Sequence, residues 1–214
     1  MKHLQYPIAL EGLFYIGLFF GFFVVSLFLL PFIWILFFVG LFLWSLWFFR
    51  NPRREFESSN ENLVVSPADG QIVAIGPALE NHFLKQEMMK MSIFMNVFSV
   101  HVNRAPLNAH VANVVYKQGK FLMAHHKEAS LENEQNALLL HFKDTPLVLV
   151  QIAGKIARRI ISYADIGTDL QRGEAFGLIK FGSRVDLYLP LNSTVKVKAG
   201  EKVKSGETVL AEIL

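Results

Sequence analysis

Ser183 is the residue of this sequence whose surroundings are best suited to chemistry, and it lies in the hexapeptide Phe-Gly-Ser-Arg-Val-Asp at 181–186. If residues 179–189 form a strand, alternation of side chains makes Ser183 the only polar residue on an otherwise apolar face. A buried hydroxyl needs a partner, and a glycine inside a strand marks a bulge or a close approach. Alone, the hexapeptide favours a structural serine beside a bulge glycine at Gly182, so a nucleophilic Ser183 needs support from elsewhere.

Two other segments carry side chains that could assist a serine. Asp69 lies in Ser-Pro-Ala-Asp-Gly at 66–70, where proline fixes φ and Asp-Gly favours a reversal, so by itself it is a turn residue. His101 ends a largely apolar strand within residues 98–106. The ordinary histidine pKa of about 6.5 suits proton transfer, although a lone histidine in such a strand is more often structural.

Composition and motifs exclude several kinds of site. The absence of cysteine rules out disulfides, thiolate metal sites and a cysteine nucleophile. The seven histidines include no HExxH pattern or other ligand spacing, so no metal is predicted. Walker and G-x-S-x-G motifs are missing, and a net charge of +3 without basic-aromatic runs gives no reason to expect nucleic acid.

The N-terminal quarter is predicted to be a membrane hairpin occupying residues 1–50. Residues 12–49 contain no charge, and as helix they would measure about 57 Å against a hydrocarbon core of about 30 Å. Pro31 divides this run, which predicts helices at 12–30 and 32–49. The flanking basic residues place both termini in the cytoplasm: Lys2, Arg50, Arg53 and Arg54. A shallow hairpin that does not reach the far leaflet is the alternative.

The remainder divides into a polar linker at 51–62 and a β-rich domain at 63–214, in which short apolar runs alternate with turn residues. Residues 87–91, with Lys90 in Met-Lys-Met, resemble the attachment site of biotinyl carrier domains, and residues 197–213 resemble their closing hairpin. A carrier lysine tops an exposed turn, whereas Lys90 leads into a long strand. The predicted fold class is therefore all-β, a barrel-sandwich or biotinyl-like domain, preceded by a transmembrane helical hairpin.

Read together, six ordered segments resemble the short, bacterial-type phosphatidylserine decarboxylase proenzymes. These are Phe-Phe-Arg-Asn-Pro-Arg (48–53), SPADGQI (66–72), VFSVHVNRAP (97–106) and the runs at 119–136, 151–160 and 172–190. The resemblance covers nearly the full length and replaces the structural interpretation of Ser183.

The resemblance implies self-cleavage between Gly182 and Ser183. The hydroxyl of Ser183 attacks the preceding carbonyl, and elimination then leaves Ser183 as a pyruvoyl group. That group condenses with the substrate amine to a Schiff base, without pyridoxal phosphate or metal. By the family's motifs, His101 is the base and Asp69 orients it. Arg104 stands where longer relatives carry a second histidine, and we expect it to neutralise a phosphate or carboxylate of the substrate.

The implied reaction is decarboxylation of phosphatidylserine to phosphatidylethanolamine. The implied partners are a phospholipid substrate in the membrane and a heterodimer of residues 1–182 and 183–214, with a homodimer of this pair left open. The implied location is the cytoplasmic (inner) membrane of a bacterium, with the catalytic domain on the cytoplasmic side. Two alternatives remain: decarboxylation of another lipid with a serine headgroup, and a non-catalytic, membrane-tethered carrier.

Overall fold

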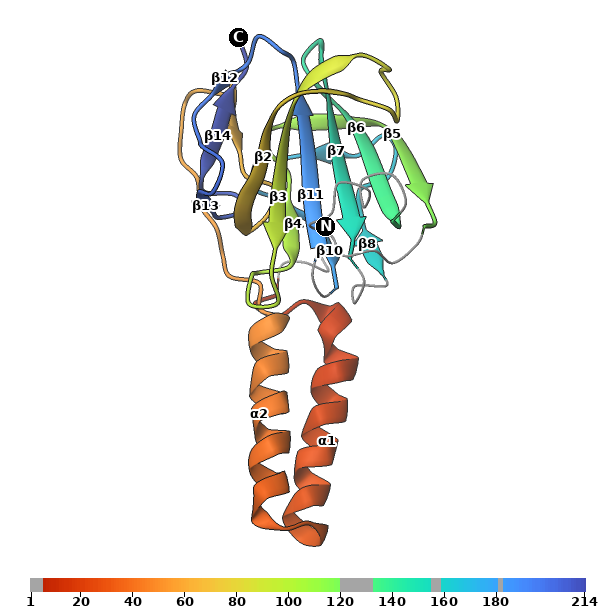
Figure 1. Ribbon diagram of the computed structural model, residues 1–214, viewed down its shortest axis with the longest axis vertical. Coiled ribbons are helices and arrows are strands. Elements are labelled where there is room, and N and C mark those ends of the chain that lie inside the picture. Colours follow the sequence, from red (N-terminus) through yellow and green to blue (C-terminus); the bar gives the residue numbers. More distant parts are fainter. Residues whose placement is uncertain (1–5, 120–132, 155–158, 181–182) are drawn as a thin grey trace. The chain divides into compact units, whose positions relative to one another are not determined.

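A computed structural model describes residues 6–119, 133–154, 159–180 and 183–214. The chain divides into two units, Met1–Arg53 and Arg54–Leu214. The first is helical and the second is made of strands, which confirms the expected fold class of an all-β domain after N-terminal apolar helices (Figure 1).

The first unit is a hairpin of two apolar helices, α1 (Leu13–Leu29) and α2 (Phe32–Phe48), preceded by the 3-10 turn η2 (Leu10–Gly12). The break falls at Leu30 and Pro31, both extended, because proline lacks the amide hydrogen that a continuing helix needs. Aromatic side chains pack between the helices, with the rings of Phe20 and Phe42 5.3 Å apart. Leu10–Leu29 is long and apolar enough to cross a membrane, whereas Phe32–Phe48 is equally apolar but shorter.

The second unit contains short strands joined by turns, as its alternation of apolar runs and turn residues predicts. In chain order the described strands are β1 (Leu63–Val65), β2 (Gly70–Leu79), β3 (Glu87–Met95), β4 (Val102–Arg104), β5 (Ala109–Lys117), β6 (Gln135–Phe142), β7 (Thr145–Ala153), β8 (Ile160–Ser162), β9 (Asp169–Leu170), β10 (Ala175–Ile179), β11 (Ser183–Leu189), β12 (Thr194–Val195), β13 (Lys202–Val203) and β14 (Val209–Glu212).

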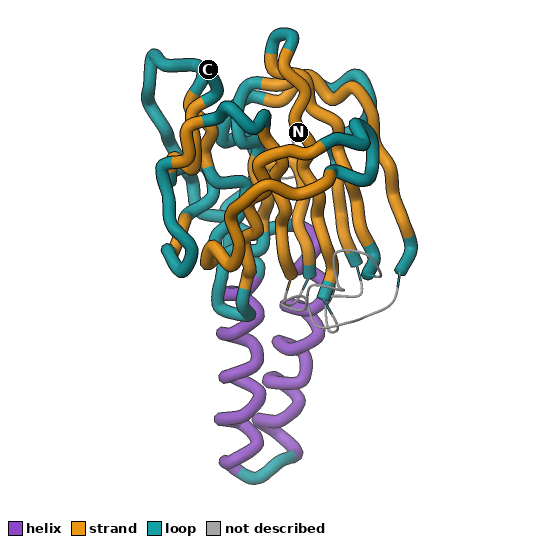
Figure 2. Tube along the Cα trace, turned by 45° about the horizontal axis from the view of Figure 1, so that its top comes forward, coloured by secondary structure: helices purple, strands orange, loops and turns teal. Residues whose placement is uncertain are grey.

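The strands form one large antiparallel sheet and two small ones. The large sheet has the order β13-β2-β3-β11-β7-β6-β5-β9, and it curls as strands twist (Figure 2). The small sheets have the orders β4-β10-β8 and β1-β14-β12. β11 lies between β3 and β7, and every one of its residues is buried. Ser183 therefore begins a central strand of the large sheet.

The strand predicted over residues 179–189 is wrong at its start. Ile179 is the last residue of β10, which pairs with β4 and β8 in a small sheet, whereas β11 starts at Ser183 in the large sheet. The chain crosses from one sheet to the other between them, and apolar sequence on both sides hides the crossing. Gly182, the expected bulge glycine, lies outside the described residues.

Ser183 lies in a core of buried apolar side chains. Val185 and Leu187 share its face, and both are fully buried. Phe176 and Leu178 of β10 are buried to the same degree. Each such side chain stabilises the fold by about 1.5 to 3 kcal/mol, so β11 and β10 are rigid supports for whatever lies between them.

The segment after Arg53 is irregular but not loose. Arg172 donates hydrogen bonds to the carbonyl oxygens of Asn60 and Ser58 at 2.8 and 3.0 Å, and its guanidinium lies 4.8 Å from the ring centre of Phe56. Arg172 therefore holds residues 56–60 of the predicted linker at 51–62 against the rest of the β unit.

Candidate active site

Ser183 lies directly opposite Met95 of β3 and Ala153 of β7. Its side chain is fully buried, and its hydroxyl donates to the sulfur of Met95 at 3.4 Å. A thioether is a weak acceptor and cannot take the proton. The hydroxyl is therefore held in a defined place without being deprotonated there.

His101 lies immediately before β4, and it is 2% exposed. Its backbone carbonyl accepts a hydrogen bond from the amide of Ile179 at 3.3 Å, at the end of β10 from which the chain runs to Ser183. Its Nδ1 lies 2.9 Å from the carbonyl oxygen of Ser99. A carbonyl can only accept, so Nδ1 carries the hydrogen and Nε2 is the basic nitrogen of the neutral ring.

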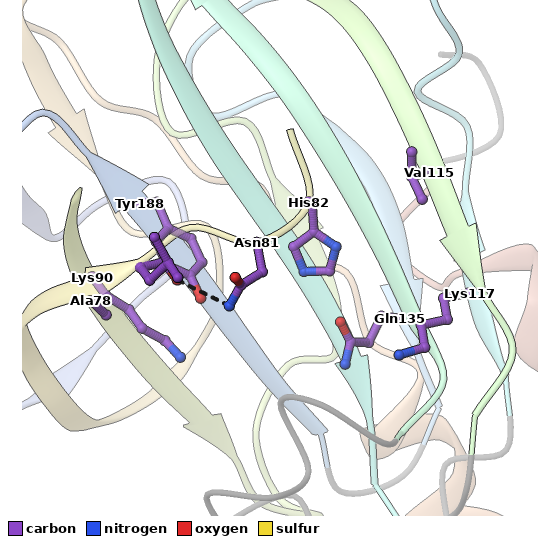
Figure 3. Close-up of a pocket in the computed structure, with 9 residues that line it drawn as sticks. Ala78, Asn81, His82, Lys90, Val115, Lys117, Gln135 and Tyr188 are labelled. Atoms are coloured by element: carbon purple, nitrogen blue, oxygen red, sulfur yellow. Dashed lines mark hydrogen bonds between the residues drawn. The ribbon is translucent and has the colours of Figure 1, made fainter. Parts of the chain in front are cut away.

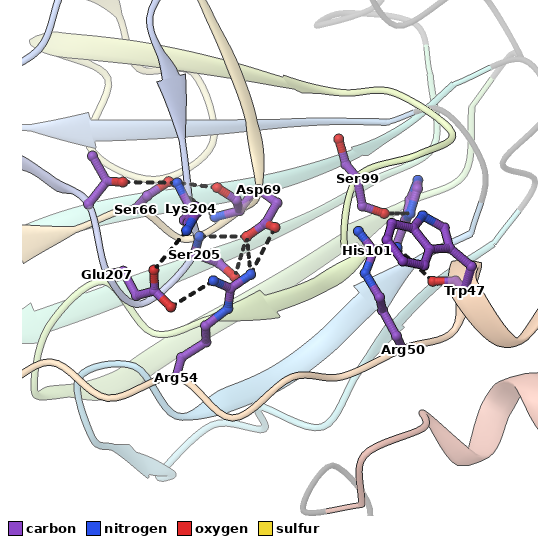
Figure 4. Close-up of polar contacts among 12 residues, drawn as sticks. Trp47, Arg50, Arg54, Ser66, Asp69, Ser99, His101, Lys204, Ser205 and Glu207 are labelled. Atoms are coloured by element: carbon purple, nitrogen blue, oxygen red, sulfur yellow. Dashed lines mark hydrogen bonds and ion pairs between the residues drawn. The ribbon is translucent and has the colours of Figure 1, made fainter.

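Asp69 is bound to a different set of groups. Its Oδ1 accepts hydrogen bonds from the amide and hydroxyl of Ser205 at 2.7 and 3.0 Å, and its Oδ2 pairs with Arg54 at 3.0 Å. Figure 4 shows Asp69 with Arg54, Ser205 and Glu207 in one cluster, and His101 with Ser99 in another. The expected direct orientation of His101 by Asp69 is not the arrangement of the described residues, because the C-terminal hairpin and Arg54 take up the carboxylate.

The turn that carries Asp69 is fixed by its neighbours. Ser66 donates from its hydroxyl to the carbonyl of Ala68 at 2.7 Å. A β-carbon at Gly70 would lie 2.2 Å from the carbonyl oxygen of Phe94, so only glycine fits where this turn enters β2. The sequence signalled the turn correctly, but the partners of its carboxylate come from residues far away in the chain.

Arg104 belongs to the Asp69 cluster and is 7% exposed. Its guanidinium donates to the carbonyl of Gly173 at 2.9 Å, and its backbone amide donates to Pro67 at 2.9 Å. Burial lowers the pKa of Arg104, the positive charge of Arg54 lowers it further, and Asp69 opposes both. On β4, Arg104 points to the face opposite that of Asn103, which contacts Met95 beside Ser183. The expected role in substrate binding therefore has no support from its position.

Replacing Asp69 with asparagine is expected to destabilise the β unit. The change leaves the charges of Arg54 and Arg104 without their shared carboxylate in a mostly buried setting, with side-chain exposures of 10% for Arg54 and 14% for Asp69. The expected loss is about 2 to 4 kcal/mol. Thermal unfolding of the Asp69→Asn protein in detergent, measured on an uncleavable Ser183→Ala background, checks it.

Glu207→Gln is the matched control, because Glu207 pairs with the same Arg54 at 2.6 Å but is 35% exposed. Its loss should be below about 1 kcal/mol. The hydrogen bond from Arg54 lowers the pKa of Glu207, so its small stabilising effect is present above the ordinary carboxylate pKa and disappears as the pH falls through the lowered value. Equal melting temperatures for the Ser183→Ala protein with and without Asp69→Asn would contradict the structural role of Asp69.

Lys90 does not have the setting of a carrier lysine. It lies inside β3 and pairs with the buried Asp186 at 2.8 Å. It lines a cavity of about 350 Å³ with Tyr188, His82 and other residues from β2, β5 and β6 (Figure 3). Tyr188 and Ser183 lie on opposite faces of β11, so this cavity does not reach Ser183. A non-catalytic carrier is therefore not favoured.

The described residues contain no group of three or more His, Asp or Glu side chains placed to hold a metal ion. What they do provide is a buried hydroxyl at Ser183, a buried histidine with a fixed tautomer at His101, and a line of amide side chains that the sequence alone did not single out: Asn103, Gln151 and Asn136. Only their unusual burial distinguishes them, and burial is not visible in a single sequence.

Comparison with known proteins identifies the family. Residues 41–211 match the family model described as phosphatidylserine decarboxylase. The chain is 47% identical over 214 residues to a phosphatidylserine decarboxylase proenzyme of Geotalea daltonii, with 98% of each chain covered. It is 46% identical to that of Syntrophotalea carbinolica and 47% identical to that of Geotalea uraniireducens, again with 98% of each chain covered. The chain therefore belongs to the phosphatidylserine decarboxylase family.

Proposed function

We propose that this chain cleaves itself at Gly182-Ser183 and then decarboxylates phosphatidylserine to phosphatidylethanolamine and CO2. The full-length match to phosphatidylserine decarboxylase proenzymes is the observation that supports this most strongly. The word proenzyme in their names accords with a chain that is processed before it acts.

In the proposed processing, the Ser183 oxygen forms a bond to the Gly182 carbonyl carbon while the carbon–nitrogen bond breaks, which converts the amide to an ester. His101 takes the hydroxyl proton and returns it to the freed amine. Removal of the Ser183 α-proton then expels the Gly182 carboxylate. Water hydrolyses the resulting enamine, by way of its imine tautomer, to a pyruvoyl group and ammonia.

The residues around Ser183 fit a pyruvoyl group. It would occupy the volume of the serine that it replaces, at a position that is fully buried. When formed, it supplies a ketone that can draw electrons from the bond to the departing carboxylate. The chain's own contribution is to exclude water through β10 and β11 and to hold a proton at His101 for return to the product carbon.

The two fragments would stay together after cleavage. β11 remains hydrogen-bonded to β3 on one side and β7 on the other, and β14 remains paired with β1. The hydrogen bonds between Asp69 and Ser205 also join the two fragments. The proposed mature enzyme is thus a heterodimer of residues 1–182 and 183–214.

The apolar hairpin supports a lipid substrate that stays within a bilayer. Leu10–Leu29 has the length and composition to cross a membrane. Arg50 and Arg53 follow α2 in the sequence, so we propose that the β unit lies on the cytoplasmic side of the bacterial inner membrane. An anchored enzyme can reach headgroups without extracting the diacyl lipid.

The purified protein should release CO2 from vesicles that contain phosphatidylserine and accumulate phosphatidylethanolamine. Parallel vesicles with another lipid carrying a serine headgroup distinguish the alternative substrate, since the proposed chemistry acts on the serine moiety and not on the acyl chains. Turnover of the other lipid with none of phosphatidylserine would contradict the proposed substrate. A cleaved protein that releases CO2 from neither lipid would contradict the proposed activity.

A further inference from the structure

A line of buried polar side chains runs through the core to Ser183. Its members come from five strands and are at most 4% exposed: Asn136, Gln151, Asn103, Met95 and Ser183. Asn136 donates to the Oε1 of Gln151 at 2.9 Å, and Gln151 donates to the Oδ1 of Asn103 at 2.8 Å. Asn103 in turn donates to the sulfur of Met95 at 3.7 Å. The same sulfur accepts from the Ser183 hydroxyl.

The hydrogen bonds fix which way each amide faces. Gln151 receives a donor on its oxygen, so its nitrogen must face Asn103, and Asn103 then presents its own nitrogen to Met95. Since a thioether is only an acceptor, the two donors that meet at its sulfur are the Asn103 amide and the Ser183 hydroxyl. The line therefore delivers an N–H donor to the immediate surroundings of Ser183.

A glycine of β10 leaves room for the Gln151 side chain in this line. A β-carbon at Gly177 of β10 would lie 3.3 Å from the Nε2 of Gln151 and 2.4 Å from the carbonyl oxygen of Ile161. Glycine at this position lets the Gln151 side chain cross from the large sheet to Asn103 of β4. Three buried amides contribute little net stability over apolar side chains of similar shape, because each gives up its bonds to water. Their presence in the buried core needs another reason.

We propose that Asn103 is a positioning residue for self-cleavage, orienting the Ser183 hydroxyl through the sulfur of Met95 while Gln151 and Asn136 lock its amide. The inference rests on the proposed function, because it assigns a role within that cleavage. Attack on the preceding carbonyl needs the Ser183 oxygen held in one orientation, and a misplacement of about 1 Å can slow such a step about a hundredfold.

The first test follows cleavage of the full-length chain made by cell-free synthesis in the presence of detergent. Asn103→Leu keeps the volume and removes the amide, and it should cleave at least about tenfold more slowly than wild type. Thermal unfolding of the same variant on a Ser183→Ala background shows whether the fold survives. A folded Asn103→Leu protein that cleaves at the wild-type rate would overturn the proposal.

Asn103→Asp gives a readout that a purely structural role would not produce. A carboxylate can accept from Gln151 but cannot donate to Met95, whereas a protonated carboxyl can do both. The cleavage rate of Asn103→Asp, divided by the wild-type rate at the same pH, should therefore rise severalfold as the pH is lowered from 8 to about 5.5, because burial favours the protonated form. A ratio that stays constant over this range speaks against positioning by the donor.

Two methionines of β3 provide a matched pair. Met95 contacts Ser183, whereas Met88 is equally buried on the opposite face, in the apolar cluster around Tyr188. Met95→Leu should slow cleavage about threefold or more, and Met88→Leu should leave it unchanged. Equal self-cleavage rates for the two variants would show that Met95 does not help to position Ser183. If Ser183→Ala itself were cleaved, the proposed function would fail; if it stays intact while the Asn103 variants cleave normally, only this inference fails.

Discussion

The Ser183→Ala protein should remain a single chain of 214 residues and release no CO2 from phosphatidylserine. Without the hydroxyl there is no nucleophile for the amide-to-ester step, and without that step no pyruvoyl group forms. The fold should survive, since the bond that the removed oxygen makes among the described residues is a weak one, to the sulfur of Met95. Denaturing electrophoresis and lipid analysis of the same preparation check both expectations.

Ser193→Ala is the control for this experiment. Ser193 is also buried and also lies in residues 183–214, but its hydroxyl has no hydrogen-bond partner in the described part of the chain. It should cleave and turn over as wild type does. A Ser183→Ala protein that is cleaved and active would contradict the assignment of Ser183, whatever the behaviour of Ser193.

Replacing His101 with alanine should lower the rate of self-cleavage about 10²- to 10⁴-fold, the usual contribution of a general base. The Ser183 hydroxyl now rests against a thioether that cannot accept its proton, so loss of His101 leaves it without the proposed base. A time course of precursor disappearance measures the effect. Decarboxylation per cleaved molecule, measured separately, tests the second proposed role of His101 in returning a proton to the product.

His110→Ala serves as the comparison because His110 is half exposed and bonded to Asp169 at 2.7 Å on β5. It should process normally. If His101→Ala cleaves as fast as His110→Ala and is equally active, His101 has no part in the reaction, and another base must serve Ser183.

Local patterns in the sequence predicted the parts of this protein that depend on local physics. An uncharged run divided by Pro31 predicts the helical hairpin, because proline kinks or breaks the interior of a helix but is accepted where a helix begins. Short apolar runs between turn residues gave the all-β unit. The alternation that placed Ser183 on an apolar face matches its full burial beside Val185 and Leu187.

The errors and omissions concern contacts between distant segments. The family's motifs predict that Asp69 orients His101, whereas among the described residues its carboxylate binds Ser205 and Arg54, whose proximity depends on how the C-terminal hairpin closes on the sheet. The predicted strand over 179–189 begins too early. It joins the end of β10 to β11, which are both apolar but belong to different sheets. Asn103 passed unnoticed beside His101, since an asparagine attracts attention only when its burial is known.

The intact mass of the purified, denatured protein tests the central claim most directly. The account predicts two species: a chain that ends at Gly182, and a chain of residues 183–214 whose first residue has the mass of a pyruvoyl group and whose N-terminus resists Edman degradation. A single species with the mass of the uncleaved chain, found in a preparation that decarboxylates phosphatidylserine, would contradict it.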